Sequence, residues 1–116
     1  MAVLGFHFSD VYRTCLLKRT KTATIMCGEN YFRVAQEILV YLSNKPNLFK
    51  GKIEERIGRA IIERVEIKKV RDLTVEEARL SGSKNLKKLK SELKKWYNSD
   101  ENSVVTFVKF NLQLEQ

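Results

Sequence analysis

The sequence contains little proline and glycine and no repetitive segment. Only one proline and five glycines occur in 116 residues. This excludes a flexible linker of that composition, and we find no internal repeat or low-complexity tract. Hydrophobic residues make up 43% and charged residues 31% of the chain, as in globular rather than disordered proteins. Length and composition therefore predict one domain spanning residues 1–116.

Long hydrophobic runs are also missing. No apolar stretch approaches the length of about 18 residues that a membrane-spanning helix needs. The first residues, MAVLGFHFSD, lack the basic segment and extended apolar run of a signal peptide. We therefore expect a cytoplasmic protein with no membrane partner.

Cysteine and histidine are scarce. Cys15 and Cys27 are not spaced as a CxxC motif, and His7 is the only histidine. This pattern predicts no metal site and no cofactor, whereas a disulfide between the two cysteines stays open. In the cytoplasm we expect both thiols to be reduced.

Acidic residues are outnumbered by basic ones, which leaves a formal net charge of +8. Charge bears on partners rather than on fold, and it favours nucleic acid as a partner. Small lysine-rich domains without such a role are also common. The segment Asn85–Tyr97 is expected to be a helix with its leucine stripe and Trp96 in the core. The lysines on its other faces either follow phosphates or form a solvated face.

Local patterns predict most elements. Strands are expected at Val3–Phe8, Thr22–Met26, Glu37–Leu42 and Val104–Leu114, from apolar alternation and β-branched content. Ile57–Val70 reads as one strand with a bulge or as two strands. Helices are expected after Ser9, from the capping box of Thr74 and Glu77 to Gly82, and over Asn85–Tyr97. This order predicts an α+β fold with a curved sheet or small barrel.

The stretch KRTKTATI at residues 18–25 combines cations with threonines where a strand begins. It is either a solvated strand edge or the rim of a pocket for an anionic ligand. Thr24 alone is explained by β-propensity. Residues three apart on a regular strand face opposite sides, so Lys21 and Thr24 converge only if Lys21 precedes the strand.

Three motifs carry a resemblance to a known family. They are LLKRTKTATI at Leu16–Ile25, RDLTVEEARLSGSKNLKKLKSELKKWY at Arg71–Tyr97 and VVTFVKF at Val104–Phe110. In this order they resemble the ASCH (activating signal cointegrator homology) domains, a branch of the PUA-like β-barrels. The resemblance implies a PUA-like small mixed β-barrel flanked by about three helices, with a cleft between barrel and helices.

The resemblance also implies a ligand in that cleft, namely RNA or a nucleotide. Arg19 and Lys21 would contact phosphate, and Thr22 and Thr24 would meet a base edge. Arg33 and the helix lysines would extend the footprint. Such contacts position an RNA but specify little of its sequence. A monomer or weak dimer is expected.

An enzymatic branch of the family provides the alternative. Of the common motif GxKxxExR this chain keeps only Lys21, but Lys21 and Thr24 are similar to the Lys-x-x-Thr of small N4-acetylcytidine amidohydrolases. There a glutamate acts with the pair, and Ser81 stands at or beside its position. Ser81 is therefore a ligand-contact candidate, and a carboxylate from 72–77 would have to replace the glutamate near Lys21 or Thr24. A protein-interaction adaptor using the basic helix is a second alternative.

Overall fold

The computed structural model describes residues 5–43 and 54–115. The first two residues of the predicted strand Val3–Phe8 lie outside these ranges. The elements, in chain order, are β1 (Gly5–Ser9), η1 (Asp10–Tyr12), α1 (Arg13–Leu17), β2 (Ala23–Cys27), β3 (Glu37–Ser43), β4 (Glu54–Lys69), η2 (Val70–Asp72), α2 (Val75–Leu80), α3 (Leu86–Tyr97) and β5 (Val104–Leu114).

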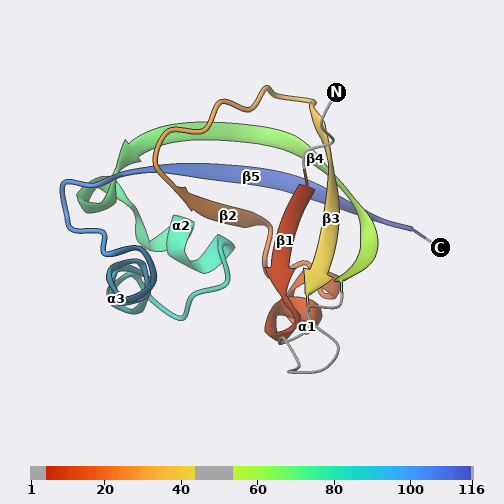
Figure 1. Ribbon diagram of the computed structural model, residues 1–116, viewed down its shortest axis with the longest axis horizontal. Coiled ribbons are helices and arrows are strands. Elements are labelled where there is room, and N and C mark those ends of the chain that lie inside the picture. Colours follow the sequence, from red (N-terminus) through yellow and green to blue (C-terminus); the bar gives the residue numbers. More distant parts are fainter. Residues whose placement is uncertain (1–4, 44–53, 116) are drawn as a thin grey trace.

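The five strands form one curved mixed sheet in the order β1-β3-β4-β5-β2 (Figure 1). β1 pairs with β3 in parallel, and the other neighbours pair antiparallel. The sheet is a half-barrel whose end strands are β1 and β2, with three α-helices beside it. This arrangement confirms the predicted α+β class with a curved, barrel-like mixed sheet and about three helices.

β4 explains much of the curvature. It is one strand of 16 residues, and its register against β5 shifts between Ile62 and Arg64. A bulge bends a strand and increases its twist, so the single bulged strand is confirmed over two separate strands. Gly58 allows the β4 backbone to approach β5 closely. An added Cβ at this position would lie 2.2 Å from the carbonyl oxygen of Gln113.

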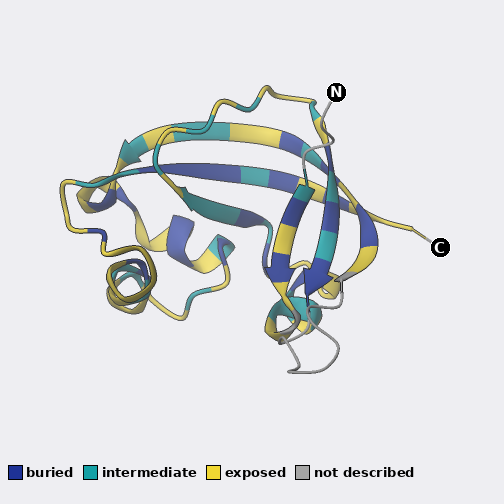
Figure 2. Cartoon of the chain, viewed as in Figure 1, coloured by how far each residue is buried: buried dark blue, intermediate teal, exposed yellow. Residues whose placement is uncertain are grey.

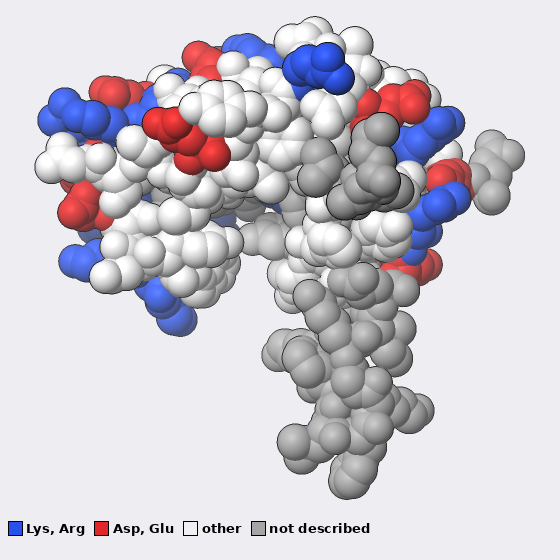
Figure 3. All heavy atoms as spheres, turned by 45° about the horizontal axis from the view of Figure 1, so that its top comes forward, with Lys and Arg blue, Asp and Glu red and all other residues white. Residues whose placement is uncertain are grey.

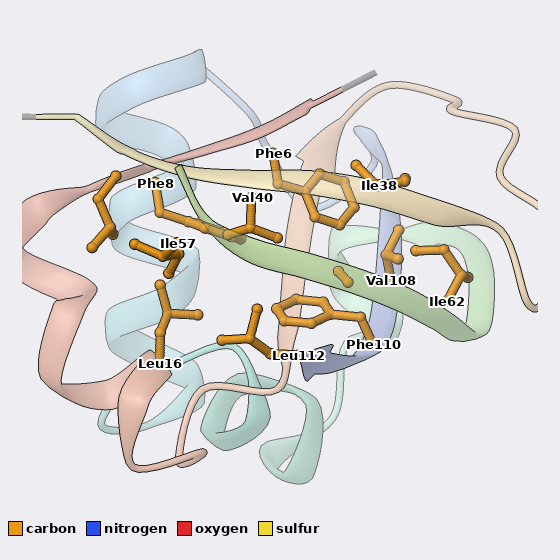
Figure 4. Close-up of a cluster of buried hydrophobic side chains, with 12 residues drawn as sticks. Phe6, Phe8, Leu16, Ile38, Val40, Ile57, Ile62, Val108, Phe110 and Leu112 are labelled. Atoms are coloured by element: carbon orange, nitrogen blue, oxygen red, sulfur yellow. The ribbon is translucent and has the colours of Figure 1, made fainter. Parts of the chain in front are cut away.

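Two hydrophobic clusters hold the half-barrel and the helices together. The larger cluster gathers side chains from β1, α1, β3, β4 and β5 (Figure 4) and consists of Phe6, Phe8, Leu16, Ile38, Val40, Leu42, Ile57, Ala60, Ile62, Val108, Phe110 and Leu112. The smaller cluster joins the helices to β5 and consists of Val70, Leu73, Ala78, Leu89, Leu93 and Val105. β5 contributes to both and is buried along most of its length (Figure 2).

α2 begins with the predicted capping box. The Thr74 hydroxyl accepts a hydrogen bond from the Glu77 amide at 3.1 Å, and the Glu77 carboxylate accepts one from the Thr74 amide at 2.9 Å. Glu77 also accepts a hydrogen bond from Nζ of Lys68 at 2.6 Å. Burial would raise the pKa of Glu77, but the bonds from Lys68 and Thr74 outweigh it and lower that pKa. The capping carboxylate therefore ties α2 to β4.

Gly82 terminates α2, as predicted, two residues after the last helical residue, Leu80. Gly82 has a φ of +94°, which glycine adopts without a Cβ penalty. The amide of Ser83 donates to the carbonyl of Ala78 at 3.0 Å, a bond of the Schellman motif. The chain turns sharply here, and this turn brings the end of α2 toward β2.

The start of α1 and the burial of Trp96 in α3 differ from expectation. The chain after Ser9 first forms η1, and α1 begins only at Arg13. In α3 the leucines Leu89 and Leu93 are buried as predicted, but Trp96 is 57% exposed. The expectation that Trp96 lies in the core is therefore wrong, because the last turn of α3 borders a cavity instead of the hydrophobic cluster.

Candidate functional site

A cavity of about 570 Å³ lies between the two end strands of the sheet and α3. β1 and η1 form one side, β2 another, and α3 with the end of α2 the rest. Figure 3 shows a hollow between the two halves of the molecule, bordered in this view mainly by uncharged side chains. Cavities of roughly 300–1,000 Å³ are typical of small-molecule sites.

Lys21 is buried in this cavity, with only 5% of its surface exposed. Its Nζ donates hydrogen bonds to the carbonyl oxygens of Ala23 at 2.9 Å and Ser81 at 2.5 Å. The same atom lies 4.8 Å from the ring centre of Tyr12 and 5.1 Å from that of Phe8. The ammonium group is thus held by two carbonyls and two aromatic rings, which partly offset the loss of water.

Burial lowers the pKa of Lys21 to about 8, against a smaller opposing effect of Cys15 and Glu92. At neutral pH the ammonium form therefore still predominates. An ammonium group has three N–H donors, and the hydrogen bonds given above use two of them. The third donor has no oxygen or nitrogen partner among the described residues, and Lys21 lines the cavity.

Thr24 lines the same cavity. Lys21 precedes β2, which begins at Ala23, so the strict alternation of a strand does not separate Lys21 from Thr24. Within residues 5–43 and 54–115 the Thr24 hydroxyl makes no hydrogen bond, and it is free to meet a ligand.

The tight turn before β2 explains how Lys21 reaches the cavity. Arg19 has a φ of +61°, and the amides of Thr20 and Lys21 both donate to the carbonyl of Cys15, at 2.9 and 3.1 Å. The Arg19 guanidinium donates to the carbonyl of Leu112 at 2.6 Å. Arg19 therefore secures the turn to β5 and does not line the cavity.

The other predicted contact residues are divided between the cavity and its surroundings. Ser81 lines the cavity, and its hydroxyl donates to the carbonyl of Ala78 at 2.9 Å. Thr22 and Arg33 do not line it: the Thr22 backbone pairs with α2 and β5, and Arg33 is exposed in the β2–β3 loop. Ligand contacts by Arg19, Thr22 and Arg33 stay predictions.

Aromatic residues of the cavity wall were not singled out by the sequence. Trp96 and Tyr97 are 57% and 52% exposed and border the cavity from α3, and Tyr12 of η1 borders it too. Exposed aromatic faces on a cavity wall are suited to stacking on a planar ligand. Their position after the leucine stripe resembled that of core residues, so only tertiary packing distinguishes them.

Glu92 was also missed. It is the only carboxylate in the described part of the chain that lines the cavity, and it comes from α3. Its charge contributes, after burial, to a raised pKa of Tyr12. The carboxylates expected to serve here do not line the cavity: Asp72 and Glu76 are exposed, and Glu77 caps α2. A lone glutamate among lysines gives no sequence signal for a site.

Other site types have no support in the ranges that the structure describes. No group of His, Cys, Asp and Glu side chains there is placed to hold a metal ion. Cys15 is half-buried, Cys27 is exposed, and both are free thiols. None of the described helices combines the length and apolarity that crossing a bilayer requires.

Comparisons with known proteins identify the fold. No protein-family model and no curated protein matches the sequence. A protein of Enterococcus faecalis V583, described under the family model DUF984, is similar in structure at a TM-score of 0.66 and 12% identity, over 98% of this chain and 82% of that one. An ASCH domain of Lactobacillus crispatus JV V101 is similar at a TM-score of 0.63 and 13% identity, over 94% and 80%. The chain therefore has the fold of an ASCH domain, as its three motifs predict.

Proposed function

We propose that this protein binds the base of a nucleotide, free or within single-stranded RNA, in the cavity beside Lys21. The observation that carries this proposal is a buried ammonium group with one spare donor next to exposed aromatic faces. Trp96 and Tyr97 offer stacking surfaces, and the Thr24 hydroxyl offers a hydrogen bond. Unpaired bases are bound in this manner, by stacking and by contacts to their edges.

The charge distribution supports a ligand with phosphates. A shallow hollow of about 430 Å³ on α3 is lined by Lys87, Lys88 and Lys95, and it shares Glu92 with the main cavity. These three lysines form no ion pair with another described residue. A phosphate next to a base in the cavity would thus meet unpaired positive charge.

Trp96 makes the proposal directly measurable, because it is the only tryptophan in the chain and borders the cavity. Titration with nucleoside monophosphates and with short single-stranded RNA should quench its fluorescence. Lys21→Met keeps the alkyl chain but removes the donor, and it should weaken binding about tenfold, the usual effect of losing a charged hydrogen bond.

The matched control is Lys69→Met, which removes an exposed lysine of β4 that has no ion pair among the described residues. It should leave the affinity near that of the wild type. Absence of quenching and of calorimetric heat with every ligand would overturn the proposal. Equal losses in the two variants would remove Lys21 from the site.

Hydrolysis of an acylated base is the second candidate, favoured by the convergence of Lys21 and Thr24 on one cavity and by the lowered pKa of Lys21. The Thr24 hydroxyl would add to the amide carbonyl while Lys21, in its neutral form, takes the proton. The amine would then leave with the proton that Lys21 returns to it, and water would hydrolyse the acyl-threonine, releasing the acid and restoring the hydroxyl. No described carboxylate hydrogen-bonds to Lys21 or Thr24, so binding is the better-supported function.

Incubation with N4-acetylcytidine tests this second candidate. Release of cytidine that disappears in Thr24→Val, which lacks the hydroxyl, would establish hydrolysis. Binding of N4-acetylcytidine without any release would leave the cavity a binding site only.

A further inference from the structure

Glu92 lines the cavity without a hydrogen-bond or ion-pair partner in the described part of the chain. It is half-buried in the wall formed by α3 and makes no hydrogen bond or ion pair with any described residue. Lys88 and Lys95, one turn away on either side, lie at spacings where glutamate and lysine commonly pair. The Glu92 carboxylate is therefore available in the cavity to accept hydrogen bonds from a ligand.

Lys21 provides the complementary group in the same cavity. Glu92 acts on Lys21 electrostatically, yet the two form no ion pair of the kind present elsewhere in the protein, such as Lys68 with Glu77 at 2.6 Å. One cavity thus contains a cationic donor and an anionic acceptor that are separated from each other. A ligand lying between them needs an acceptor for Lys21 and donors for Glu92.

The four RNA bases differ in how they meet this demand. A carboxylate accepts two hydrogen bonds side by side and is repelled by a neighbouring acceptor. Guanine carries two adjacent donors, N1–H and N2–H, next to the acceptor O6. Cytosine and adenine place a ring-nitrogen acceptor beside their amino group, and uracil has a single N–H between two carbonyls. Only guanine offers paired donors and an adjoining acceptor.

Building on the proposed nucleotide binding, we infer that Glu92 is a specificity-determining residue that selects guanine. Its carboxylate accepts hydrogen bonds from N1–H and N2–H, and Lys21 donates to O6. Trp96 and Tyr97 supply stacking that every base can accept, so the main selectivity among bases falls to Glu92. The ligand class is a guanine nucleotide or a guanine in single-stranded RNA.

The test compares guanosine, inosine and uridine 5′-monophosphates by calorimetry. Inosine differs from guanosine only in lacking the 2-amino group, so it removes one of the two donors. The wild type should bind the guanosine nucleotide about tenfold more tightly than the inosine nucleotide, as expected for one hydrogen bond to a carboxylate. Glu92→Gln should bring this ratio close to one.

Glu76→Gln is the matched control, because Glu76 is exposed on α2, lies outside the cavity and loses the same charge. It should keep the ratio of the wild type. Equal wild-type affinities for the three nucleotides, or an equal weakening of all three by Glu92→Gln, would overturn base selection and leave nucleotide binding standing. Failure of every nucleotide and of single-stranded RNA to bind would remove the proposed function itself.

Discussion

Lys21 lies with its alkyl chain against Gly82, where an added Cβ would be 3.4 Å from Cδ of the lysine, and with its ammonium group near two aromatic rings. Burial of an ammonium group is expensive even when carbonyls accept its hydrogen bonds. An apolar side chain would fill this position without that penalty. The lysine is therefore better explained by a ligand than by the stability of the fold.

The buried lysine predicts a particular pH dependence of stability. Its pKa is about 8 in the folded protein against an ordinary value of 10.5, so between these values the unfolded chain binds more protons. The free energy of unfolding should therefore rise with pH in this window, by on the order of 3 kcal/mol when complete. Chemical denaturation of wild type and Lys21→Met across about pH 7 to 10.5 measures the difference between the two.

The difference in free energy of unfolding between wild type and Lys21→Met removes the contribution of other groups that titrate in this window. Lys69→Met, which removes an exposed lysine, should follow the wild type. Parallel curves for wild type and Lys21→Met would show that the Lys21 pKa is not lowered.

At the scale of elements, α2 is short, and its ends depend on specific hydrogen bonds. The capping box of Thr74 and Glu77 satisfies amides at its start, and the turn at Gly82 satisfies carbonyls at its end. The Ser81 carbonyl at this end accepts the hydrogen bond from Lys21. Capping of α2 therefore also positions the Ser81 carbonyl that holds Lys21 in the cavity.

Removal of the cap should destabilise the protein. Thr74→Ala deletes the hydroxyl that accepts from the Glu77 amide and should lower the free energy of unfolding by about 1 kcal/mol. Thr74→Ser retains the hydroxyl and should recover most of this loss. Urea denaturation of the three proteins measures both effects, and equal stability of Thr74→Ala and wild type would contradict the role of the cap.

The contact between β4 and β5 makes a second prediction at this scale. An alanine Cβ at position 58 would lie 2.2 Å from the backbone oxygen of Gln113, and backbone in a paired strand has little freedom to move. Gly58→Ala should lower the free energy of unfolding by about 1–3 kcal/mol, the usual cost of overpacking. Thermal and urea denaturation test this, with Gly28→Ala for comparison.

Comparing Gly58→Ala with Gly28→Ala distinguishes steric overlap with a neighbouring strand from backbone strain. Gly28 has a φ of +80° but no atom within 4 Å of an added Cβ, so its substitution brings backbone strain alone, about 1–2 kcal/mol. A loss at Gly58 no larger than at Gly28 would mean that the two strands separate easily.

At the scale of the whole molecule, the sheet is a half-barrel with β1 and β2 as end strands, and both strands border the cavity with α3. A closed barrel would pair these edges and leave no such space. The excess of positive charge, +8 overall, includes the unpaired lysines on α3 next to this opening. The position of the cavity and the positive charge of α3 therefore favour a single-stranded RNA that runs along α3 and inserts one base into the cavity.

Salt dependence distinguishes a strand from a single nucleotide. For single-stranded RNA the logarithm of the binding constant should fall with the logarithm of salt, with a slope of about −0.7 for each phosphate contacted. Replacing both Lys88 and Lys95 by methionine should make this slope shallower, because the RNA then loses phosphate contacts. A flat salt response would contradict a phosphate-binding role of α3.

Much of the architecture was predictable because it rests on local interactions. The alternation in Val104–Leu114 predicted β5 with the bounds observed, and the capping box predicted the start of α2. The order of three motifs predicted the ASCH fold that the structural comparisons show. The extent of β4 was left open, because a bulge and a strand break look alike in sequence; pairing on both sides makes it one strand.

The sequence by itself thus determined most of the elements and the capping box of α2, since these depend on neighbours along the chain, and the order of its three motifs indicated the fold. Only the tertiary structure decided which side chains share a cavity, because that depends on how distant elements pack. It placed Lys21 with Thr24 and Ser81, and added Trp96 and Glu92. It tied Arg19 to β5 instead, through the hydrogen bond from its guanidinium to the Leu112 carbonyl.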